Sequence, residues 1–219
     1  MRRHDNISYT LSDLGNIVQG CAGFTEELSS SITKKYKTFQ EIEGKSILEA
    51  GCGSGKLGMF FEKFGMDCVG IDIDKEQIEY ANKLKSILNI LFETDVGISF
   101  YEGTVHKLEF PNNHFNFCFS EGVIEHWTGQ KRQNVVNEMA RVASDVVMIF
   151  VPWSGHEESR KIARECEHTF VGMGKREYPL SEEQLRKNLE DAGLHDIDVH
   201  PCRQDIPIAR RMLFGVGYK

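Results

Sequence analysis

From residue 46 onward, short apolar runs alternate with longer amphipathic segments. Strands that alternate with helices form a mostly parallel sheet, because each crossover helix returns the chain to the edge at which the next strand begins. The chain has 219 residues, of which 40% are hydrophobic, so it can form one such domain with a complete core. The sequence therefore predicts a doubly wound α/β fold.

Seven runs have the length and composition of strands, and a central position is predicted for the run at 145–151, which is apolar on both faces. Parallel neighbours are expected on both sides of that strand. The link at 202–209 is too short for a crossover helix, so the last strand should be antiparallel to its neighbour. The predicted strands are 46–50, 68–71, 98–103, 115–120, 145–151, 194–200 and 210–218.

The segments between these runs predict helices on both faces of the sheet. Ser181 and Gln184 have the spacing of a capping box, and Gly193 follows the last turn of the same segment. The expected helices begin at residue 57 and cover about 75–89, about 130–142 and 182–191.

Three glycines alternate at Gly51, Gly53 and Gly55, between the first strand and the first helix. Glycine permits a sharp turn there, and it leaves room for a ligand where a β-carbon would collide. The segment EAGCGSGKLG therefore indicates a loop that binds a nucleotide-type cofactor.

Two known glycine loops can be compared with this segment. A phosphate-binding P-loop would need glycine and Ser or Thr where this chain has Ala50 and Leu57, so that interpretation fails. A dinucleotide loop stays open, because residues 53–58 spell GxGxxG and Asp72 follows at the spacing of a ribose-binding acid. The glycines alone do not distinguish a nicotinamide cofactor from another nucleoside cofactor.

Three blocks of sequence together resemble the class I S-adenosylmethionine-dependent methyltransferases. They are EAGCGSG, VGIDID at the end of the second strand, and FPNNHFNFCFSEGVIEHW around the fourth. The blocks are correctly ordered and spaced, and they cover residues 45–153. The resemblance implies a Rossmann-like sheet, the cofactor S-adenosylmethionine with S-adenosylhomocysteine as product, and methyl transfer to a small molecule.

The chemistry of the cofactor is consistent with this resemblance. S-adenosylmethionine has no phosphate, but it carries a sulfonium, an amino group, a carboxylate and a ribose diol, so its site should offer acceptors as well as backbone amides. Asp72 can accept both ribose hydroxyls in charge-assisted hydrogen bonds. The other role for an acid here, the N-cap of the following helix, suits Asp74 better.

By resemblance, Glu49 orders the backbone amides beneath the loop, Ile73 presses on the adenine, and Ser120 and Glu121 flank the methionine part. Many relatives have an acid at the position of Thr104, so the adenine contact at Thr104 departs from the family pattern. The complete set implied for the cofactor is Glu49, Gly51, Cys52, Gly53, Gly55, Asp72, Ile73, Gly103, Thr104, Val105, Ser120 and Glu121.

The acceptor side is less constrained by the sequence. His126 is the candidate catalytic base, because the ordinary pKa of histidine lies close to neutrality, although packing or capping beside Trp127 is the alternative. By resemblance, Trp153 and His168 belong to a segment that forms a wall of the acceptor pocket. The alternative for this segment is a solvated amphipathic helix.

The N-terminal stretch has Phe24, Leu28, Ile32 and Tyr36 at helical spacing. It can close over the cofactor and bring Tyr36 to the substrate, or it can simply dock on the core. We expect one domain over 1–219, in which 1–45 form a helical lid. The remaining parts are 46–151 as the cofactor-binding half, 152–179 as an acceptor-pocket insertion, and 180–219 as the last helix and strand pair.

The net charge of −7 and the pI near 5.6 argue against a nucleic-acid partner. The most apolar run, 146–151, is too short to span a bilayer, and the N-terminus has no apolar leader, so a cytoplasmic protein without a membrane partner is expected. Six scattered cysteines without a CxxC pair fit a reducing compartment, and no metal site is expected. The oligomeric state stays open.

Two alternatives to a methyltransferase remain. One is a relative that binds the cofactor without transferring methyl groups, because fold does not secure chemistry. The other is a nicotinamide-dependent oxidoreductase, which the GxGxxG spacing permits.

Overall fold

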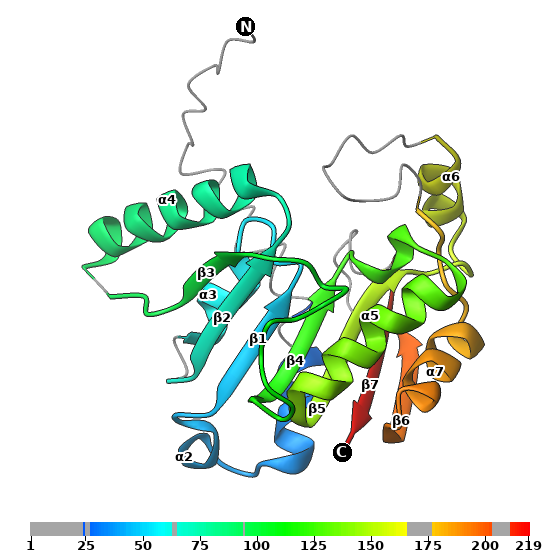
Figure 1. Ribbon diagram of the computed structural model, residues 1–219, viewed down its shortest axis with the longest axis horizontal. Coiled ribbons are helices and arrows are strands. Elements are labelled where there is room, and N and C mark those ends of the chain that lie inside the picture. The colour runs from blue at the N-terminus through cyan, green and yellow to red at the C-terminus, as the bar shows by residue number, and fades with distance from the viewer. Residues whose placement is uncertain (1–23, 25–26, 63–64, 94, 166–176, 203–210) are drawn as a thin grey trace, which may run out of the picture.

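The computed structural model describes residues 24, 27–62, 65–93, 95–165, 177–202 and 211–219. It contains one seven-stranded sheet with the strand order β3-β2-β1-β4-β5-β7-β6 (Figure 1). All seven predicted strands are present, and the predicted doubly wound α/β fold is confirmed. The strands are β1 (Ser46–Ala50), β2 (Asp67–Asp72), β3 (Ser99–Glu102), β4 (Phe115–Glu121), β5 (Ala143–Pro152), β6 (His195–Pro201) and β7 (Met212–Tyr218).

The helices follow the predicted alternation, and residues 27–35 are also helical. At the start of α4, Asp74 accepts a hydrogen bond from the Glu76 amide as an N-cap. The predicted capping box at Ser181 and Gln184 is present at the start of α7. The helices are α2 (Phe39–Ile42), α3 (Lys56–Glu62), α4 (Lys75–Phe92), the short 3-10 helix η1 (Ile124–His126), α5 (Gly129–Val142), α6 (Glu157–Glu165) and α7 (Glu182–Asp191).

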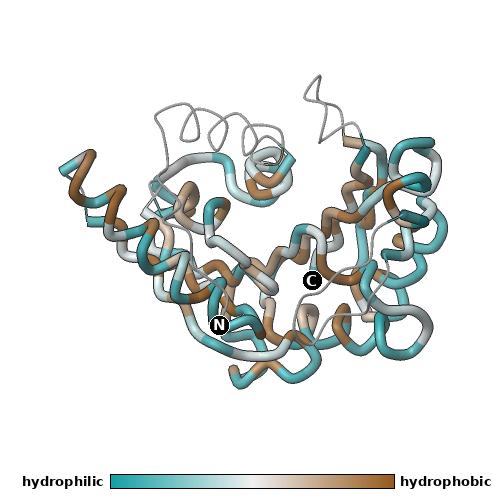
Figure 2. Tube along the Cα trace, turned by 90° about the horizontal axis from the view of Figure 1, so that it is seen from above, coloured by the Kyte–Doolittle hydropathy of each residue, from teal (hydrophilic) through white to brown (hydrophobic). Residues whose placement is uncertain are grey.

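The sheet is buried on both faces, as the composition of β5 predicts. Helices α3 and α4 and residues 27–35 cover one face, while α5 and α7 cover the other and lie in front of the sheet in Figure 1. Figure 2 shows the same layers from above, with hydrophobic residues running through the strands. In β5, Val146, Met148 and Phe150 belong to one core cluster, and Val147, Ile149 and Val151 belong to the other.

The expectation that both neighbours of β5 are parallel to it is wrong. β4 is parallel to β5, but β7 is antiparallel to both β5 and β6. The chain reaches β6 through α7 and then returns without room for a crossover helix. The last strand, β7, therefore runs back between β6 and β5. The prediction that the last strand is antiparallel to its neighbour is confirmed.

The N-terminal residues that the structure describes are docked on the sheet. Phe24, Leu28 and Ile32 are buried in the core cluster on the face of α3 and α4, and the Phe24 ring lies 4.9 Å from the Phe150 ring. These contacts agree with the alternative in which the N-terminal stretch docks on the core. The predicted lid covers residues 1–45. Before residue 27 the structure describes only Phe24, so most of that part of the lid lies outside the described residues.

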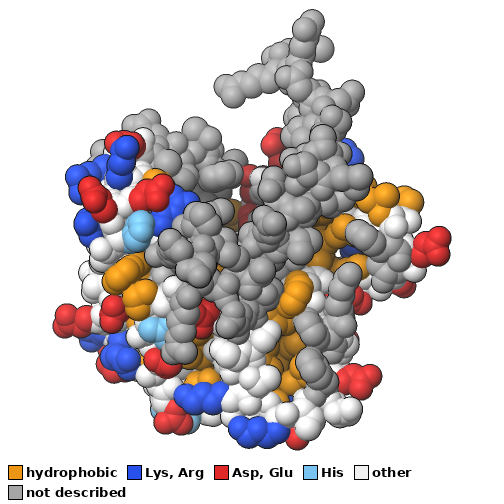
Figure 3. Space-filling view, turned by 180° about the vertical axis from the view of Figure 1, so that it is seen from behind, with side chains coloured by type: hydrophobic (Ala, Val, Ile, Leu, Met, Phe, Trp, Pro, Cys, Tyr) orange, Lys and Arg blue, Asp and Glu red, His pale blue; other side chains and the backbone are white. Residues whose placement is uncertain are grey.

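The parallel pairs β1–β2, β1–β4 and β4–β5 end at a common edge, toward which the arrowheads of β1, β2 and β4 point in Figure 1. Ala50, Asp72 and Glu121 are the last residues of three of these strands. Ligands of doubly wound folds bind at this carboxyl edge. On the face in Figure 3, Lys and Arg side chains lie among Asp and Glu side chains. Within the described part of the chain, no helix has both the length and the apolar character needed to cross a membrane.

Candidate functional site

The glycine loop turns at the carboxyl end of β1. Gly51, Gly53 and Gly55 have φ values of +77°, +48° and +69°, in the left-handed region that favours glycine. The amides of Gly51 and Cys52 both donate to the Ile71 carbonyl oxygen at 2.8 Å. The loop is therefore fixed to the end of β2, and its backbone shape explains the alternating glycines.

Asp72 at the end of β2 faces this loop. Its Oδ2 accepts a hydrogen bond from the Gly53 amide at 2.7 Å, and its Oδ1 accepts one from the Asp74 amide at 2.9 Å. Asp72 is only 3% exposed. A carboxylate has about four acceptor positions, so Asp72 can still accept hydrogen bonds from a ligand.

Glu49 lies in β1 beneath the loop and is buried. Its Oε2 accepts a hydrogen bond from the Gly58 amide at 2.9 Å, which ties the start of α3 to β1. Burial raises the pKa of Glu49 well above its ordinary value despite this hydrogen bond, and the nearby Glu121 and Asp72 raise it further. The loop is thus surrounded by acidic side chains, which favour a ligand with positive charge.

A small cavity of about 20 Å³ opens beside the loop. Of the predicted cofactor residues, the structure brings Gly51, Asp72, Ile73, Thr104 and Val105 together around it. The prediction missed three further residues that line this cavity, which are His106, Val123 and Trp127.

Two of these missed residues pack against each other. The rings of His106 and Trp127 make an edge-to-face contact with centroids 4.4 Å apart. The Thr104 hydroxyl accepts the His106 amide at 3.3 Å, which orients this turn. Trp127 is the last residue of the segment FPNNHFNFCFSEGVIEHW, but only the fold places it beside His106.

The end of β4 supplies the two residues expected at the methionine part. Ser120 is fully buried, and its hydroxyl has no hydrogen-bond partner among the described residues. Glu121 is half-buried, and burial raises its pKa while Lys56 opposes the shift. Gly103, at the end of β3, donates its amide to the Asp72 carbonyl at 2.9 Å. An unsatisfied buried hydroxyl at this edge is suited to a polar ligand.

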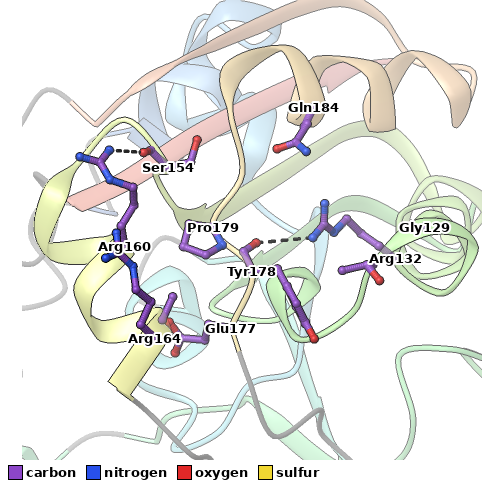
Figure 4. A pocket seen from close by; sticks show the side chains of 11 residues that line it. Gly129, Arg132, Ser154, Arg160, Arg164, Glu177, Tyr178, Pro179 and Gln184 are labelled. Carbon is purple, nitrogen blue, oxygen red and sulfur yellow. Dashed lines mark hydrogen bonds between the residues drawn. The ribbon is translucent and has the colours of Figure 1, made fainter.

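A second cavity, of about 650 Å³, lies at the same edge between the start of α5, helix α6 and the segment before α7 (Figure 4). Backbone hydrogen bonds hold one of its walls: the Tyr178 amide donates to Glu125, and the Ser154 amide donates to Leu180, at 2.9 and 2.8 Å. Its volume is typical of small-molecule sites.

Comparison with known proteins finds methyltransferases among the relatives of this chain. Residues 48–150 match the profile of the family described as "Methyltransferase domain". The uncharacterized methyltransferase YcgJ of Bacillus subtilis is 27% identical over 99 residues, which are 44% of this chain and 35% of the relative. The family match and this relative support a class I S-adenosylmethionine-dependent methyltransferase.

Further matches support the assignment to this methyltransferase family. The ubiquinone biosynthesis O-methyltransferase of Proteus mirabilis is 33% identical over 73 residues, which are 32% of this chain and 27% of the relative. The structure of magnesium protoporphyrin IX methyltransferase from Synechocystis with bound SAH superposes with a TM-score of 0.68 and 16% identity, covering 99% of this chain and 90% of that one. The sequence matches thus span 35% and 27% of the two curated relatives, and the structural match shows a shared fold.

The candidate base of this methyltransferase, His126, lies in η1 and is buried. Its ring centroid is 6.2 Å from that of Trp127, in an edge-to-face arrangement. Neither of the two cavities is lined by His126. Its catalytic role stays a prediction, and its burial is compatible with the packing alternative.

Of the two residues predicted for the wall of the acceptor pocket, the structure describes one, Trp153. Trp153 forms a bridge with Leu180 just after β5 and packs on the core cluster of α5. It does not line the larger cavity, but the next residue, Ser154, does. His168 lies outside the described residues.

Tyr36 does not lie at the acceptor side. Its hydroxyl donates to Asp145 near the start of β5, and its ring packs on Phe117 of β4 with centroids 5.7 Å apart. Asp145 belongs to the amino edge of the parallel sheet, whereas Glu121 is at the carboxyl edge. This placement does not favour the prediction that Tyr36 binds substrate and agrees with the alternative, in which the helical spacing serves docking to the core.

Tyr36 should consequently contribute to stability and not to cofactor binding. The Tyr36→Phe variant loses a hydrogen bond to a charged group, so its free energy of unfolding should fall by about 1.5–3 kcal/mol. Urea denaturation measures this change. The affinity for S-adenosylhomocysteine, measured by calorimetry, should equal that of the wild type; a weaker affinity with unchanged stability would contradict the placement of Tyr36.

Proposed function

We propose that this chain transfers the methyl group of S-adenosylmethionine to a small-molecule acceptor. The observation that carries the proposal is the glycine loop held by Asp72 beside a cavity at the carboxyl edge of the sheet. This is the position at which doubly wound folds bind nucleosides.

The charge of the site supports this cofactor rather than a dinucleotide. Glu49, Asp72 and Glu121 surround the loop, and the positively charged sulfonium and amino groups of S-adenosylmethionine complement these acids. The pyrophosphate of a nicotinamide cofactor would face like charges there. The buried Ser120 hydroxyl adds a group that needs a polar partner.

The cavity beside the loop is smaller than an adenosine, so side chains at its mouth must move when the cofactor binds. Ile73 is 37% exposed there, and His106 and Trp127 are half-buried. None of these three side chains is fully buried, so they can shift more easily than the buried residues around the cavity, although Trp127 also packs against a core cluster. Trp127 is one of two tryptophans in the chain, so its fluorescence should report the binding.

Bound S-adenosylmethionine supplies a methyl group on a good leaving group, the sulfonium sulfur. In this proposal Asp72 accepts the ribose hydroxyls, while Ile73 and Val105 contact the adenine and Ser120 and Glu121 orient the methionine part. Holding the two reactants in line can contribute about 7–11 kcal/mol in favourable cases, so a base is not obligatory. His126 remains the proposed base for an acceptor that must lose a proton.

The relatives support a small-molecule acceptor. The Proteus mirabilis relative is named for ubiquinone biosynthesis, and the Synechocystis protein is named for magnesium protoporphyrin IX. The larger cavity of this chain also has the volume of a small-molecule site. We further propose a reducing, cytoplasmic setting, since Cys52, Cys68, Cys118 and Cys202 are buried free thiols.

Ligand binding tests the cofactor assignment. S-adenosylhomocysteine should bind the wild-type chain in calorimetry and change its tryptophan emission, while NAD should do neither. Binding of NAD without S-adenosylhomocysteine would overturn the proposal in favour of an oxidoreductase. A screen of a metabolite pool with methyl-labelled S-adenosylmethionine then tests catalysis: a labelled product excludes the non-catalytic alternative, and S-adenosylhomocysteine binding without any labelled product favours it.

A further inference from the structure

Guanidinium groups dominate the charge of the 650 Å³ cavity defined above. Arg132 of α5 lines it from one side, and Arg160 and Arg164 of α6 line it from the other, with Tyr178 between them in Figure 4. Glu177 is the one carboxyl group among the lining residues of this cavity. Three guanidiniums against one carboxylate leave an excess of positive charge in a chain whose net charge is −7.

Arg132 is the buried member of this group, with 8% of its surface exposed. Its Nε donates to the carbonyl oxygens of Ile124 and Trp127 at 3.3 and 2.9 Å, and its Nη2 donates to the Tyr178 carbonyl at 3.4 Å. These neutral partners fix the side chain in place. Among the described residues, its Nη1 has no hydrogen-bond partner and no carboxylate lies within 4.0 Å of the guanidinium.

Arg160 and Arg164 are one turn apart on α6, so they present their guanidiniums on the same side of the helix. Arg160 donates Nη1 to the Ser154 carbonyl, which holds it at the cavity wall (Figure 4). In the part of the chain that the structure describes, neither arginine forms a salt bridge. Of the residues that the structure describes, Arg132 has only the nearby buried Glu125 as an electrostatic partner, and Glu177 is the one acid that lines the cavity. Arg160 and Arg164 are exposed, so their guanidiniums are free to bind an anion that enters the cavity.

The position of the larger cavity relates it to methyl transfer. Thr128 and Gly129 line it, and they follow directly on Trp127, which lines the smaller cavity beside the glycine loop. The two cavities therefore lie on either side of one short segment, residues 123–129. A molecule in the larger cavity would be adjacent to the proposed cofactor site.

We propose that the larger cavity is the acceptor site and that Arg132, Arg160 and Arg164 bind a carboxylate or phosphate group of the acceptor. The acceptor of this enzyme is then an anionic small molecule. Tyr178, which lines the same cavity and is 44% exposed, offers a ring for an aromatic or apolar part of the same molecule. The inference rests on the proposed function for its claim that the bound anion is the methyl acceptor.

Matched pairs of small probes test the anionic subsite. Benzoate and phenyl phosphate, compared with neutral benzamide and phenol, are titrated into the full chain saturated with S-adenosylhomocysteine, with affinity followed by ligand-observed NMR. Each anion should bind about ten-fold or more tightly than its neutral counterpart. Benzoate and phenyl phosphate together distinguish a carboxylate from a phosphate preference. Equal binding of the charged and neutral probes would overturn the subsite.

Variants of α6 assign the effect to the arginines. The double variant Arg160→Gln/Arg164→Gln should lose about ten-fold or more of the anion affinity. Lys161→Gln is the matched control, since Lys161 is exposed on the same helix and does not line the cavity, and it should stay within about two-fold of the wild type. Arg132→Lys keeps the charge but shortens the hydrogen-bonding reach, and it should also weaken anion binding.

The outcomes separate the two proposals. Equal losses in the double variant and in Lys161→Gln would overturn the subsite, because only general surface charge would then be at work. S-adenosylhomocysteine binding is recorded for every variant from tryptophan emission and should not change in the α6 variants. Wild-type protein that binds anions but no S-adenosylhomocysteine would refute the proposed function, whereas the reverse result refutes only the anionic acceptor site.

Discussion

Replacement of Gly55 by alanine should destabilise the fold by about 2–5 kcal/mol. The residue has φ +69°, where a non-glycine residue costs about 1–2 kcal/mol. A β-carbon at this position would also lie 2.2 Å from the Phe100 ring. Phe100 is a buried residue of β3 within the core, so it cannot move away freely, and overpacking of this kind costs about 1–3 kcal/mol more.

Gly53 provides the matched control for this destabilisation. It lies in the same loop with φ +48°, but a β-carbon there would meet no atom within 4 Å. Gly53→Ala should therefore lose only the backbone contribution, about 1–2 kcal/mol. Urea denaturation of both variants measures the difference. Equal losses would show that contact with Phe100 does not determine the choice of glycine at position 55.

Replacement of Asp72 by asparagine should weaken S-adenosylhomocysteine binding about ten- to hundred-fold. In the proposed site the carboxylate accepts the ribose hydroxyls, and hydrogen bonds to a charged group contribute about 1.5–3 kcal/mol. Asparagine also has only one side-chain oxygen, so it cannot keep both hydrogen bonds that Asp72 accepts with its two oxygens, from the Gly53 and Asp74 amides. Calorimetry with the wild type and the variant gives the change in affinity.

Asp74→Asn is the control for loss of charge in the same turn. Asp74 caps α4 through the Glu76 amide, and asparagine is an equally good N-cap, so both stability and affinity should be nearly unchanged. A similar loss of affinity in both variants would mean that overall negative charge, and not the Asp72 contact, holds the ligand. Unchanged affinity in Asp72→Asn would remove Asp72 from the cofactor site.

The sequence predicted much of the cofactor side of this protein. The alternating glycines predict a sharp turn, and the positive φ values of Gly51, Gly53 and Gly55 agree with it. Asp72 was separated from Asp74 by its place at the end of a strand, and the two carboxylates hold the loop and the helix respectively. Such features depend on neighbouring residues and on one strand-turn-helix unit, so local rules suffice.

The acceptor side was predicted less well, because it is assembled from segments far apart in the chain. Tyr36 has the periodicity of a residue that can cover a ligand, but it pairs with Asp145 at the opposite edge of the sheet. Arg160 and Arg164 lie on a helix whose sequence also fits a solvated surface. Only the position of α6 relative to Arg132 brings the three guanidiniums to one cavity.

The sequence by itself determined the alternation of strands and helices, the glycine turn and the acid that holds it, since each follows from backbone sterics and hydrophobic periodicity over a few residues. Tertiary structure alone decided that β7 lies between β5 and β6, that Trp127 and His106 meet beside the loop, and that α6 faces α5 across a cavity. These contacts join residues distant in the chain, and the packing of whole elements selects them.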